Sequence, residues 1–297
     1  MVVMLTGATG YLGGRLLTRL KKESHRVFCV VRKSSNTESI TQLADGVFSY
    51  DEFQDLYQIM KIVSPELIIH VAGVFLNEHQ EDTIEELLNG NIMFSTVLLD
   101  AANRAGCNKI INTGTCWQRF LKECYNPINL YAATKQAFEA ILEYYVRACG
   151  WKAITLELFD VYGPNDTRKK ILNILRDLKE GESIGMTEGL QKMYLCHVDD
   201  VVEAYLCAMR LIEHQEKATS CNFAVRDEKP LSLREIVLKY LRIADKNIAI
   251  NWGERPYRER EFMDPEGVGR VLPGWKPQIR LSEGLKGYVN STEEKIE

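Results

Sequence analysis

The sequence lacks any apolar run that approaches the roughly 18 residues of a membrane-spanning helix. It also lacks a long basic stretch, because 37 Lys and Arg are spread along a chain with 41 Asp and Glu, for a net charge of −4. A nucleic-acid-binding protein usually concentrates its basic residues on one surface. We therefore expect no membrane span and no nucleic-acid partner.

Patterns typical of metal sites and disulfide frameworks are missing as well, although the chain has eight cysteines. None of them forms a C-x-x-C pair or stands beside a histidine at zinc-finger spacing. Several lie in apolar stretches, such as Cys29 in RVFCVV and Cys207 in AYLCAM, as free buried thiols do in a reducing compartment. A strand pattern that begins at Val2 leaves no length for a signal peptide. We expect a cytoplasmic protein without a metal site.

The first 160 residues or so contain a regular alternation of short apolar runs and helical patterns. The expected strands are VVMLT, RVFCVV, GVFSY, ELIIHVA, KIINTG and KAITLELF, and the longest helical patterns span residues 83–106 and 129–150. Strands that are apolar throughout and separated by helices form parallel sheets covered on both faces. The pattern predicts an α/β fold with a doubly wound parallel sheet.

After Gly163 this alternation loosens. Loops rich in Gly, Pro and charge, such as EGESIGMTEGL and NWGERPYRERE, lie among fewer helical patterns. We predict a sheet domain over residues 1–162 and, over residues 163–297, mainly a smaller mixed α/β lobe. The helix near residues 198–213 is expected to pack back on the sheet domain.

A glycine-rich stretch, MLTGATGYLGGRLL, joins the first strand to the first helix. Gly7 permits a tight turn, Gly10 lets a pyrophosphate approach the backbone, and Gly13 allows the helix to pack closely on the strand. The start of the helix adds unpaired N–H groups and a partial positive charge. The stretch therefore predicts a dinucleotide site and identifies residues 1–162 as a Rossmann-type domain.

The G-x-x-G-x-x-G spacing after Thr6 resembles the extended branch of the short-chain dehydrogenase/reductase superfamily, the NAD-dependent epimerase/dehydratase family. The resemblance covers nearly the whole chain, and members of this branch commonly act on nucleotide sugars. It implies that Ala72 and Gly73 pass beneath the cofactor and that Asp51 lies near the adenine. The cofactor site that it implies also includes Thr6, Tyr11, Leu12, Thr113, Phe159 and Val161.

The end of the second strand, VFCVVRKSSN, indicates which nicotinamide cofactor is bound. An NAD site places Asp or Glu here to accept hydrogen bonds from the ribose 2′-hydroxyl. This chain has Arg32 and Lys33 followed by Ser34, and a cation suits a 2′-phosphate. We predict NADP(H), bound by Arg32 and Ser34. A solvated basic loop is the alternative.

Two Tyr-x-x-x-Lys pairs occur, Tyr57/Lys61 and Tyr131/Lys135. Residues four apart lie on one helix face, so each pair can bring a phenol and a cation together. Because the spacing is short, one match is expected by chance in a chain with 13 tyrosines. Tyr131/Lys135 opens a long helix after a strand that ends in NTGTC, and we predict that Tyr57/Lys61 is the coincidence.

The family resemblance implies roles for the second pair. Tyr131 would be the general acid for the reduced oxygen, and Lys135 would stabilise its tyrosinate form and bond the nicotinamide ribose. A hydroxyl at the end of the preceding strand would orient the substrate oxygen. Thr115 stands at that place, and Thr113 is the less favoured candidate.

The two residues after Thr115 bear on the type of reaction. In the family's 4,6-dehydratases an Asp-Glu pair follows the catalytic Thr, whereas Cys116 and Trp117 stand here. Both are expected at the substrate: Cys116 as a small packing residue or a reactive thiol, and Trp117 as a stacking partner of the sugar or a wall of the cleft. The stretches TGTCWQ, NLYAATKQAFEAIL and LFDVYGPND resemble CDP-paratose synthase-like nucleotide-sugar 4-ketoreductases.

The resemblance therefore implies NADPH-dependent reduction of a CDP- or dTDP-linked 4-keto sugar by a homodimer. The expected substrate-binding residues of the second lobe are Asn165, Arg168 and Arg255, since guanidinium groups suit a pyrophosphate. His197 is expected to be structural, ahead of a helix capped by Asp199. The alternatives are a 4-epimerase with bound NAD and a non-catalytic NADP-binding sensor.

Overall fold

A computed structural model describes the backbone of residues 1–293 and the side chains of residues 1–291. Its centre is a seven-stranded sheet in the order β11-β6-β5-β4-β1-β2-β3, in which all neighbouring strands are parallel. The predicted fold class is thereby confirmed. The strands are β1 (Val2–Thr6), β2 (Arg26–Arg32), β3 (Gly46–Tyr50), β4 (Leu67–His70), β5 (Lys109–Thr115), β6 (Lys152–Leu158) and β11 (Thr219–Val225).

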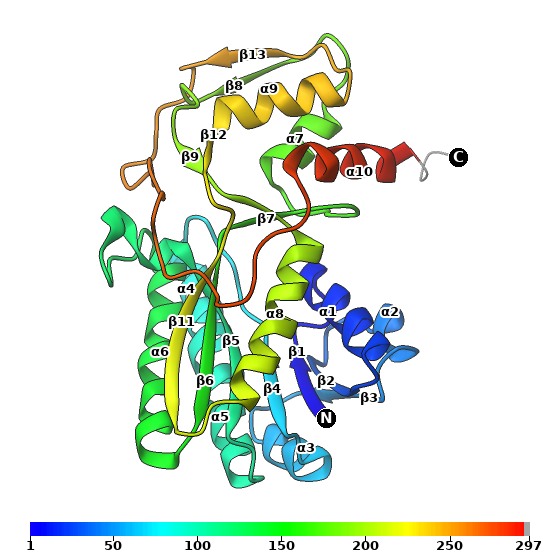
Figure 1. The fold of residues 1–297 in the computed structure, drawn as a ribbon, viewed down its shortest axis with the longest axis vertical. Coiled ribbons are helices and arrows are strands. Elements are labelled where there is room, and N and C mark those ends of the chain that lie inside the picture. Colours follow the sequence, from blue (N-terminus) through cyan, green and yellow to red (C-terminus); the bar gives the residue numbers. More distant parts are fainter. Residues whose placement is uncertain (294–297) are drawn as a thin grey trace.

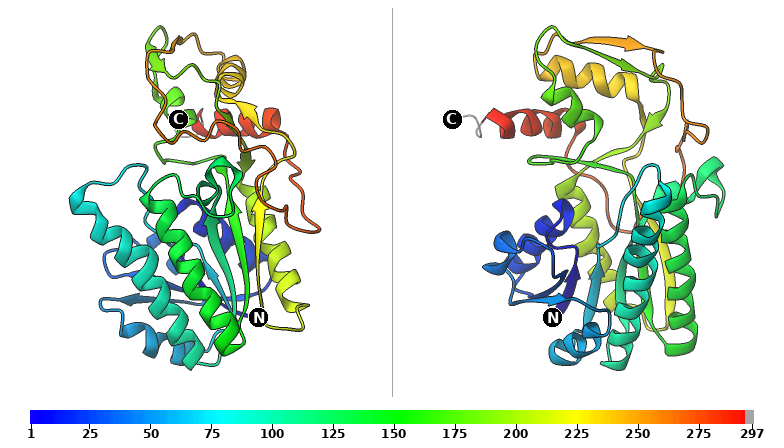
Figure 2. Two further views of the ribbon diagram at one scale, coloured as in Figure 1. Left: turned by 90° about the vertical axis from the view of Figure 1, so that its left-hand side faces the viewer. Right: turned by 180° about the vertical axis from the view of Figure 1, so that it is seen from behind.

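Helices cover both faces of the sheet (Figures 1 and 2). On one face lie α1 (Tyr11–Lys22) and α8 (Val198–Glu213), whose apolar stripes pack on the sheet in one core. On the other face a second core joins the sheet to α3 (Asp55–Val63), α5 (Phe94–Arg104) and α6 (Leu130–Cys149). The short helices α2 (Glu38–Thr41) and α4 (Ile84–Leu88) complete this domain, and a π-helical segment, Asn89–Met93, joins α4 to α5.

The seventh strand, β11, comes from beyond residue 163, and so does α8. Sequence analysis did not predict β11, because its polar residues Thr219, Ser220 and Asn222 interrupt the apolar pattern. β11 is the edge strand of the sheet, and on its outer side the described residues add only an isolated bridge between Ala224 and Val271. At the start of α8, the N-cap is His197, whose ring accepts the N–H of Asp199, and not Asp199 as the sequence predicted.

A smaller lobe stands beyond the carboxyl ends of the strands, at the top of Figure 1. Its helices α7 (Ile171–Asp177), α9 (Leu233–Ile243) and α10 (Leu281–Glu293) share a core centred on Leu175, Tyr240 and Tyr288. Short strand pairs frame this core: β7 (Asp160–Tyr162) with β10 (Leu195–His197), β8 (Ser183–Met186) with β13 (Ala249–Trp252), and β9 (Lys192–Met193) with β12 (Leu231–Ser232).

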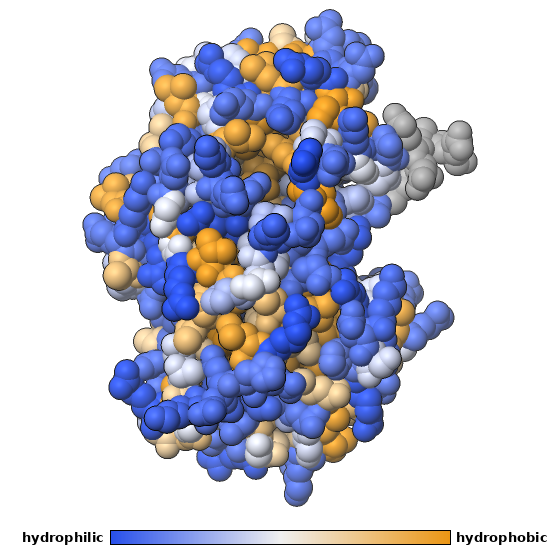
Figure 3. Space-filling model, in the orientation of Figure 1, coloured by the Kyte–Doolittle hydropathy of each residue, from blue (hydrophilic) through white to orange (hydrophobic). Residues whose placement is uncertain are grey.

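Between β13 and α10, residues 253–280 form a long irregular segment. It descends from the lobe along the sheet domain and returns to α10, as the orange-to-red trace of Figure 1 shows. Figure 3 shows an indentation between the lobe and the part of the sheet domain that carries α1. No helix among the described residues is both long and apolar enough to span a membrane.

Candidate active site

The glycine-rich loop between β1 and α1 leaves no room for a side chain at Gly7 or Gly13. Gly7 has a φ of +74°, and a Cβ there would lie 2.7 Å from the amide nitrogen of Ala72. A Cβ at Gly13 would overlap the carbonyl oxygen of Gly7, so the first turn of α1 packs directly on the loop. Gly10 differs from these two glycines. A Cβ at Gly10 would meet only the Gly7 carbonyl oxygen, at 3.3 Å, so the space beside Gly10 is open. The loop therefore fits a dinucleotide whose phosphates approach the start of α1.

A buried hydrogen-bond chain joins the loop to the end of β4. The Thr6 hydroxyl oxygen accepts the N–H groups of Val71 and Ala72, both at 3.1 Å, and lies 2.8 Å from Nδ1 of His70. Nε2 of His70 lies 2.9 Å from the Ser95 hydroxyl. Burial lowers the pKa of His70 to about 3, so its ring is neutral and serves to hold these chain ends. Ala72 and Gly73 thereby lie next to Gly7.

Asn91, in the π-helical segment, was not predicted as part of the site. Its side chain accepts the N–H of Val74 and donates to the Val74 carbonyl and to the hydroxyl of Thr134 on α6. A Cβ at Gly73 would lie 3.1 Å from Asn91 Oδ1 and 3.6 Å from Lys135 Nζ. The segment after β4 is therefore fixed against α6, with its glycine facing Lys135.

Tyr131 and Lys135 lie in the first two turns of α6. Asn129 caps this helix by accepting the N–H of Ala132, and its amide donates to the carbonyls of Leu76 and Asn77. The Tyr131 ring packs edge-on against Phe75, with 5.0 Å between the ring centroids, and against Trp117. Burial raises the pKa of Tyr131 above its usual value near 10, so the phenol keeps its proton at neutral pH.

Lys135 is 5% exposed, and no ion pair engages its ammonium group within residues 1–291. Burial lowers the pKa of Lys135 to about 8, against an opposing effect of Glu139 one turn further along α6. A buried lysine without a partner is costly, which favours a site that receives a polar ligand.

The two threonines at the end of β5 differ in their hydrogen bonds. The Thr113 hydroxyl donates to the carbonyl of His70 at 2.7 Å and lies 2.6 Å from the hydroxyl of Tyr205, which fully engages it. The Thr115 hydroxyl accepts the N–H of Trp117 at 3.3 Å and donates to no acceptor within residues 1–291, so its hydrogen can serve a ligand. This geometry favours Thr115 as the orienting hydroxyl and assigns the Thr113 side chain to the fold.

The other tyrosine–lysine pair lies elsewhere. Tyr57 donates to Asp100 Oδ2 at 2.8 Å, and Tyr145 of α6 donates to the other oxygen of the same carboxylate at 3.2 Å. Tyr145 follows Tyr131 by fourteen residues, about 21 Å along α6 at 1.5 Å per residue. Lys61 is exposed. This pair therefore has no contact with the glycine-rich loop.

At the carboxyl end of β2 the two basic residues have different partners. Lys33 forms an ion pair with Asp51 at 2.5 Å, with both side chains about two-thirds exposed. Arg32 is exposed and forms no ion pair within residues 1–291, and Ser34 is exposed beside it. Asp51 is thus next to the predicted adenosine end of the site, but it is held by Lys33. Arg32 is the cation that remains for a 2′-phosphate.

The residues after Thr115 line the site differently. Cys116 is buried with Phe159 and Tyr194, and burial raises the pKa of its thiol well above the usual range, which makes it an inert packing residue. Trp117 is only half-buried and lies between Phe75, Tyr131 and Arg258. The aromatic rings therefore form a wall beside the Tyr131 phenol.

Arg258 belongs to the irregular segment that descends from the lobe. Its guanidinium lies 5.6 Å from the Trp117 ring centroid, donates to Asn77 Oδ1 at 2.5 Å, and forms an ion pair with both oxygens of the Glu261 carboxylate at 2.9 Å. Sequence analysis selected Arg255 from the same basic run. Both arginines are exposed, but the backbone N–H of Arg255 donates to the carbonyl of Met186 in β8, which places Arg255 in the lobe. The structure brings Arg258, rather than Arg255, to the aromatic wall.

Arg168 lies at the opposite side of the site, against the start of α1. It is paired with the Asp166 carboxylate, donates to the carbonyl of Val161, and stacks over the Tyr11 ring at 4.7 Å. Asn165 precedes this pair in a left-handed backbone conformation with φ of 64°. Arg168 therefore links the lobe to the glycine-rich loop and is not brought to Trp117.

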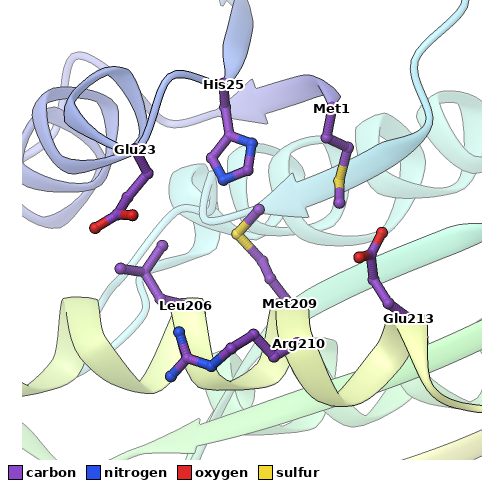
Figure 4. Close-up of a pocket in the computed structure, with 7 residues that line it drawn as sticks. All are labelled: Met1, Glu23, His25, Leu206, Met209, Arg210 and Glu213. Atoms are coloured by element: carbon purple, nitrogen blue, oxygen red, sulfur yellow. The ribbon is translucent and has the colours of Figure 1, made fainter.

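A hollow of about 200 Å³ elsewhere on the molecule is unrelated to this group (Figure 4). It lies at the amino ends of the strands, between the first residue of the chain, the end of α1 and the last turns of α8. Its lining residues include Met1, His25, Met209 and Glu213. Parallel α/β sheets bind ligands at the carboxyl ends of their strands, where the glycine-rich loop lies. Within the described part of the chain, no cluster of three or more His, Cys, Asp and Glu residues could hold a metal ion.

Comparisons with known proteins identify the family and the fold. The model of the NAD dependent epimerase/dehydratase family matches residues 3–224. A CDP-abequose synthase of Yersinia pseudotuberculosis is 27% identical over 98% of this chain and 99% of its own. A UDP-glucose 4-epimerase of Thermotoga maritima, solved with UDP-glucose, superposes over the whole of both chains with a TM-score of 0.82 and 22% identity. The Thermus thermophilus UDP-glucose 4-epimerase, solved with NAD, superposes over 99% of both chains with a TM-score of 0.80 and 20% identity.

The two solved structures are too distant in sequence to show more than the fold. The family model matches three-quarters of the chain, a range within which the glycine-rich loop, Thr115, Tyr131 and Lys135 all lie. The chain belongs to the NAD dependent epimerase/dehydratase family, the extended branch of the short-chain dehydrogenases/reductases.

Proposed function

We propose that this chain uses NADPH to reduce the C4 ketone of a nucleotide-diphosphate-linked 4-keto-deoxysugar, with CDP or dTDP as the nucleotide. The observation that carries the proposal is the group Thr115, Tyr131 and Lys135 beside the glycine-rich loop, with Cys116 and Trp117 next to it. Dehydration needs an acid and a base after the threonine, and a buried thiol and an indole supply neither. Similarity to a CDP-abequose synthase along the whole chain supports a nucleotide sugar as substrate.

The chain's own residues supply the proton and the alignment for such a reduction. A nicotinamide cofactor, when bound, supplies the hydride. Tyr131, kept protonated by burial, donates its phenol proton to the ketone oxygen, and the nearby Lys135 charge stabilises the tyrosinate that forms. The free hydrogen of Thr115 bonds the same oxygen, and the rings of Phe75 and Trp117 keep water from the phenol. Tyr131 then recovers a proton from solvent.

The proposed preference for NADPH rests on Arg32. Its guanidinium is exposed at the carboxyl end of β2, while the neighbouring Lys33 is neutralised by Asp51. An NAD site would need an unpaired carboxylate near this strand end. The NAD in the solved epimerase of Thermus thermophilus belongs to that protein and leaves the preference of this chain to be measured.

Substrate phosphates are proposed to bind where the lobe meets the aromatic wall. Arg258 lies against Trp117 on this side, and Asp160 and Lys170 form an ion pair nearby at 3.3 Å. Of the three substrate residues expected from the lobe, Asn165 and Arg168 lie at the start of α1 and Arg255 is on the surface. We propose that Arg258 is the guanidinium that faces the pyrophosphate.

The test is turnover by the purified protein with NADPH and a panel of CDP- and dTDP-linked 4-keto-6-deoxysugars and 4-keto-3,6-dideoxysugars. We expect NADPH oxidation, measured by absorbance, with formation of a 4-hydroxy sugar. Firmly bound NAD after purification, with interconversion of C4 epimers, would establish the 4-epimerase instead. Cofactor binding without turnover of any nucleotide sugar would favour a sensor.

We also propose that the protein forms a homodimer in the cytoplasm. Apolar side chains of the segment from α4 to α6 are exposed, including Ile84, Leu88, Met93 and Tyr144. Two copies pairing α5 and α6 would cover such a surface. Light scattering at micromolar concentration should give a dimer mass, which a Leu88→Asp/Met93→Asp variant should reduce to that of a monomer.

A further inference from the structure

A buried polar network that the proposed reaction does not use connects the end of β5 with α6. Gln118, with no exposed surface, is its central residue. The Gln118 amide oxygen accepts the backbone N–H of Thr115 at 2.9 Å. The amide nitrogen donates to Gln136 Oε1 at 2.9 Å and to Glu139 Oε1 at 2.8 Å. One side chain therefore ties Thr115 to the helix that carries Tyr131 and Lys135.

Glu139 is in turn held from the opposite side. Its second oxygen accepts the amide of Asn222, on β11, at 2.7 Å. The same amide lies 3.3 Å from Glu157 of β6, and the guanidinium of Arg119 pairs with both oxygens of Glu157. Because the Glu139 carboxylate only accepts hydrogen bonds, it fixes which way the Gln118 amide points, and so directs the amide oxygen to Thr115.

Lys135 adds a second cation to the charged groups of this region. Glu157 is buried and Glu139 is half-buried, and the half-buried Arg119 is paired with Glu157. Lys135, one turn before Glu139 on α6, is buried and has no ion pair within the described side chains. The neutral ring of His70 faces Lys135 from β4. Burial and the charge of Glu157 raise the pKa of Glu139, while hydrogen bonds from Gln118 and Asn222 and the charge of Arg119 oppose this.

We propose that Glu139 is a positioning residue that acts on the site in two ways: through Gln118 it fixes the backbone of Thr115, and through its charge it supports the protonated form of Lys135. The inference rests on the proposed function for the roles of Thr115 and Lys135. It assigns a task to residues that come from the turn after β5, from α6 and from β11, and that do not touch the substrate.

The two actions can be separated by substitution. Glu139→Gln removes the charge but keeps an oxygen that can accept from Gln118, so it tests the support of Lys135. Gln118→Leu removes the link to Thr115 but keeps the charge of Glu139. The exchange Gln118→Glu/Glu139→Gln restores the hydrogen bond between the two positions, with position 139 as the donor and position 118 as the acceptor. In that variant the carboxylate introduced at position 118 can accept both from the Thr115 N–H and from the amide introduced at position 139.

The first experiment measures NADPH affinity by fluorescence as a function of pH, which requires no turnover. A protonated Lys135 donates to the cofactor ribose, so affinity should fall as Lys135 loses its proton. In Glu139→Gln this fall should move to lower pH by about half a unit or more, because the charge that supports the ammonium is gone. Glu143→Gln is the matched control: Glu143 lies one turn further along α6, partly exposed and paired with Arg147, and the substitution should leave the midpoint unchanged.

The second experiment measures kcat and KM. Gln118→Leu should lower kcat about tenfold with KM and the alkaline midpoint nearly unchanged, because misplacing a positioned group affects the reacting geometry. The exchange variant should recover kcat to within about threefold of the original protein. A crystal structure of Gln118→Leu provides a readout that does not depend on folding yield: Thr115 should move relative to Tyr131.

The outcomes distinguish the inference from the proposed function. The support of Lys135 by the Glu139 charge is overturned by either of two results. One is that the pH midpoint of NADPH affinity is the same in Glu139→Gln as in the original protein. The other is that NADPH affinity in the original protein does not fall at alkaline pH. Unchanged kcat and an unmoved Thr115 in Gln118→Leu overturn the positioning action. If the protein turns over no 4-keto sugar, the proposed function fails, while the affinity midpoints and the Thr115 position still decide the inference.

Discussion

The chain carries the same Tyr-x-x-x-Lys spacing twice, on α3 and on α6, and both helices cover the same face of the sheet. On α3 the Tyr57 hydroxyl is engaged by Asp100, and Lys61 is in solvent. On α6 the Tyr131 phenol faces two aromatic rings, and Lys135 is buried without an ion pair within the described side chains. The same spacing therefore occurs in two different environments. We propose that burial and the neighbouring glycine-rich loop, rather than the spacing, give the pair on α6 its chemistry.

The largest expected effect comes from removing the phenol on α6. Tyr131→Phe keeps the ring packing against Phe75 and Trp117 but loses the proton that the ketone oxygen would receive. We expect kcat to fall at least ~100-fold, the lower range for a general acid, with NADPH affinity nearly unchanged. Steady-state kinetics and fluorescence titration measure both quantities. Tyr57→Phe is the control and should retain near-normal turnover; the reverse result would exchange the roles of the two pairs.

The second prediction concerns the buried ammonium. The folded-state pKa of Lys135, about 8, is below its usual 10.5, so the unfolded chain binds a proton more readily between these pH values. The cost of burying the charge is therefore fully present below pH 8 and is lost as pH rises toward 10.5. Lys135→Met should be more stable than the original protein at pH 7 by about 2 kcal/mol, and this gap should close at alkaline pH.

Chemical denaturation of the cofactor-free protein at pH 7, 9 and 10 measures that gap. The same variant should lose turnover and cofactor affinity, because it also loses the cation beside Tyr131. Lys61→Met, at an exposed position, should change neither stability nor its pH dependence. A pH-independent difference between Lys135→Met and the original protein would contradict the assignment of a buried, titrating ammonium.

The third prediction extends the comparison to the cofactor. If the Tyr131–Lys135 pair on α6 acts with NADPH, the original protein should bind NADPH at least about tenfold more tightly than NADH, because Arg32 can pair with the 2′-phosphate. A tenfold ratio corresponds to about 1.4 kcal/mol of binding free energy. Arg32→Ala should remove most of this preference. Arg26→Ala is the matched control, since Arg26 lies at the amino end of the same strand and stacks on Phe28. Equal affinities in the original protein would argue for NAD and for the epimerase.

The smallest effect is expected on stability at α3. Tyr57→Phe removes a half-buried hydrogen bond to Asp100, which costs about 1 kcal/mol. Tyr131→Phe should cost less, because no hydrogen bond of its hydroxyl is made within the described residues. Denaturation midpoints of the two variants test this contrast, and a larger loss for Tyr131→Phe would mean that its phenol supports the fold.

Local sequence patterns predicted much of this structure, because local interactions determine those parts. The six apolar strands, the helix periods and the glycine spacing each depend on neighbouring residues. The sequence already favoured Thr115 over Thr113 from its place at the end of the strand, but the hydrogen bond that engages Thr113 comes from Tyr205, about 90 residues later, and has no local signal. The link between Gln118, Glu139 and Asn222 joins three distant segments and has no sequence pattern.

The position of Arg258 could not be predicted from the sequence either. Several arginines follow one another in the run GERPYRERE, and the irregular path of residues 253–280 decides which of them meets Trp117. No period or cap signals that path, since the segment contains neither helix nor strand beyond an isolated bridge. Sequence reasoning could place a basic group near the cleft but could not select the residue.

The chain crosses between the sheet domain and the lobe several times, with α8 and β11 returning to the sheet after the lobe has begun. Cutting the gene near codon 162 would remove the edge strand and one covering helix, and would expose the apolar face that α8 protects. Neither residues 1–162 nor residues 163–297 could therefore be exchanged between relatives as an independently folding domain. If the proposed role of Arg258 holds, exchange of residues 253–280 as one loop is the unit by which substrate preference could be altered without dividing the sheet domain.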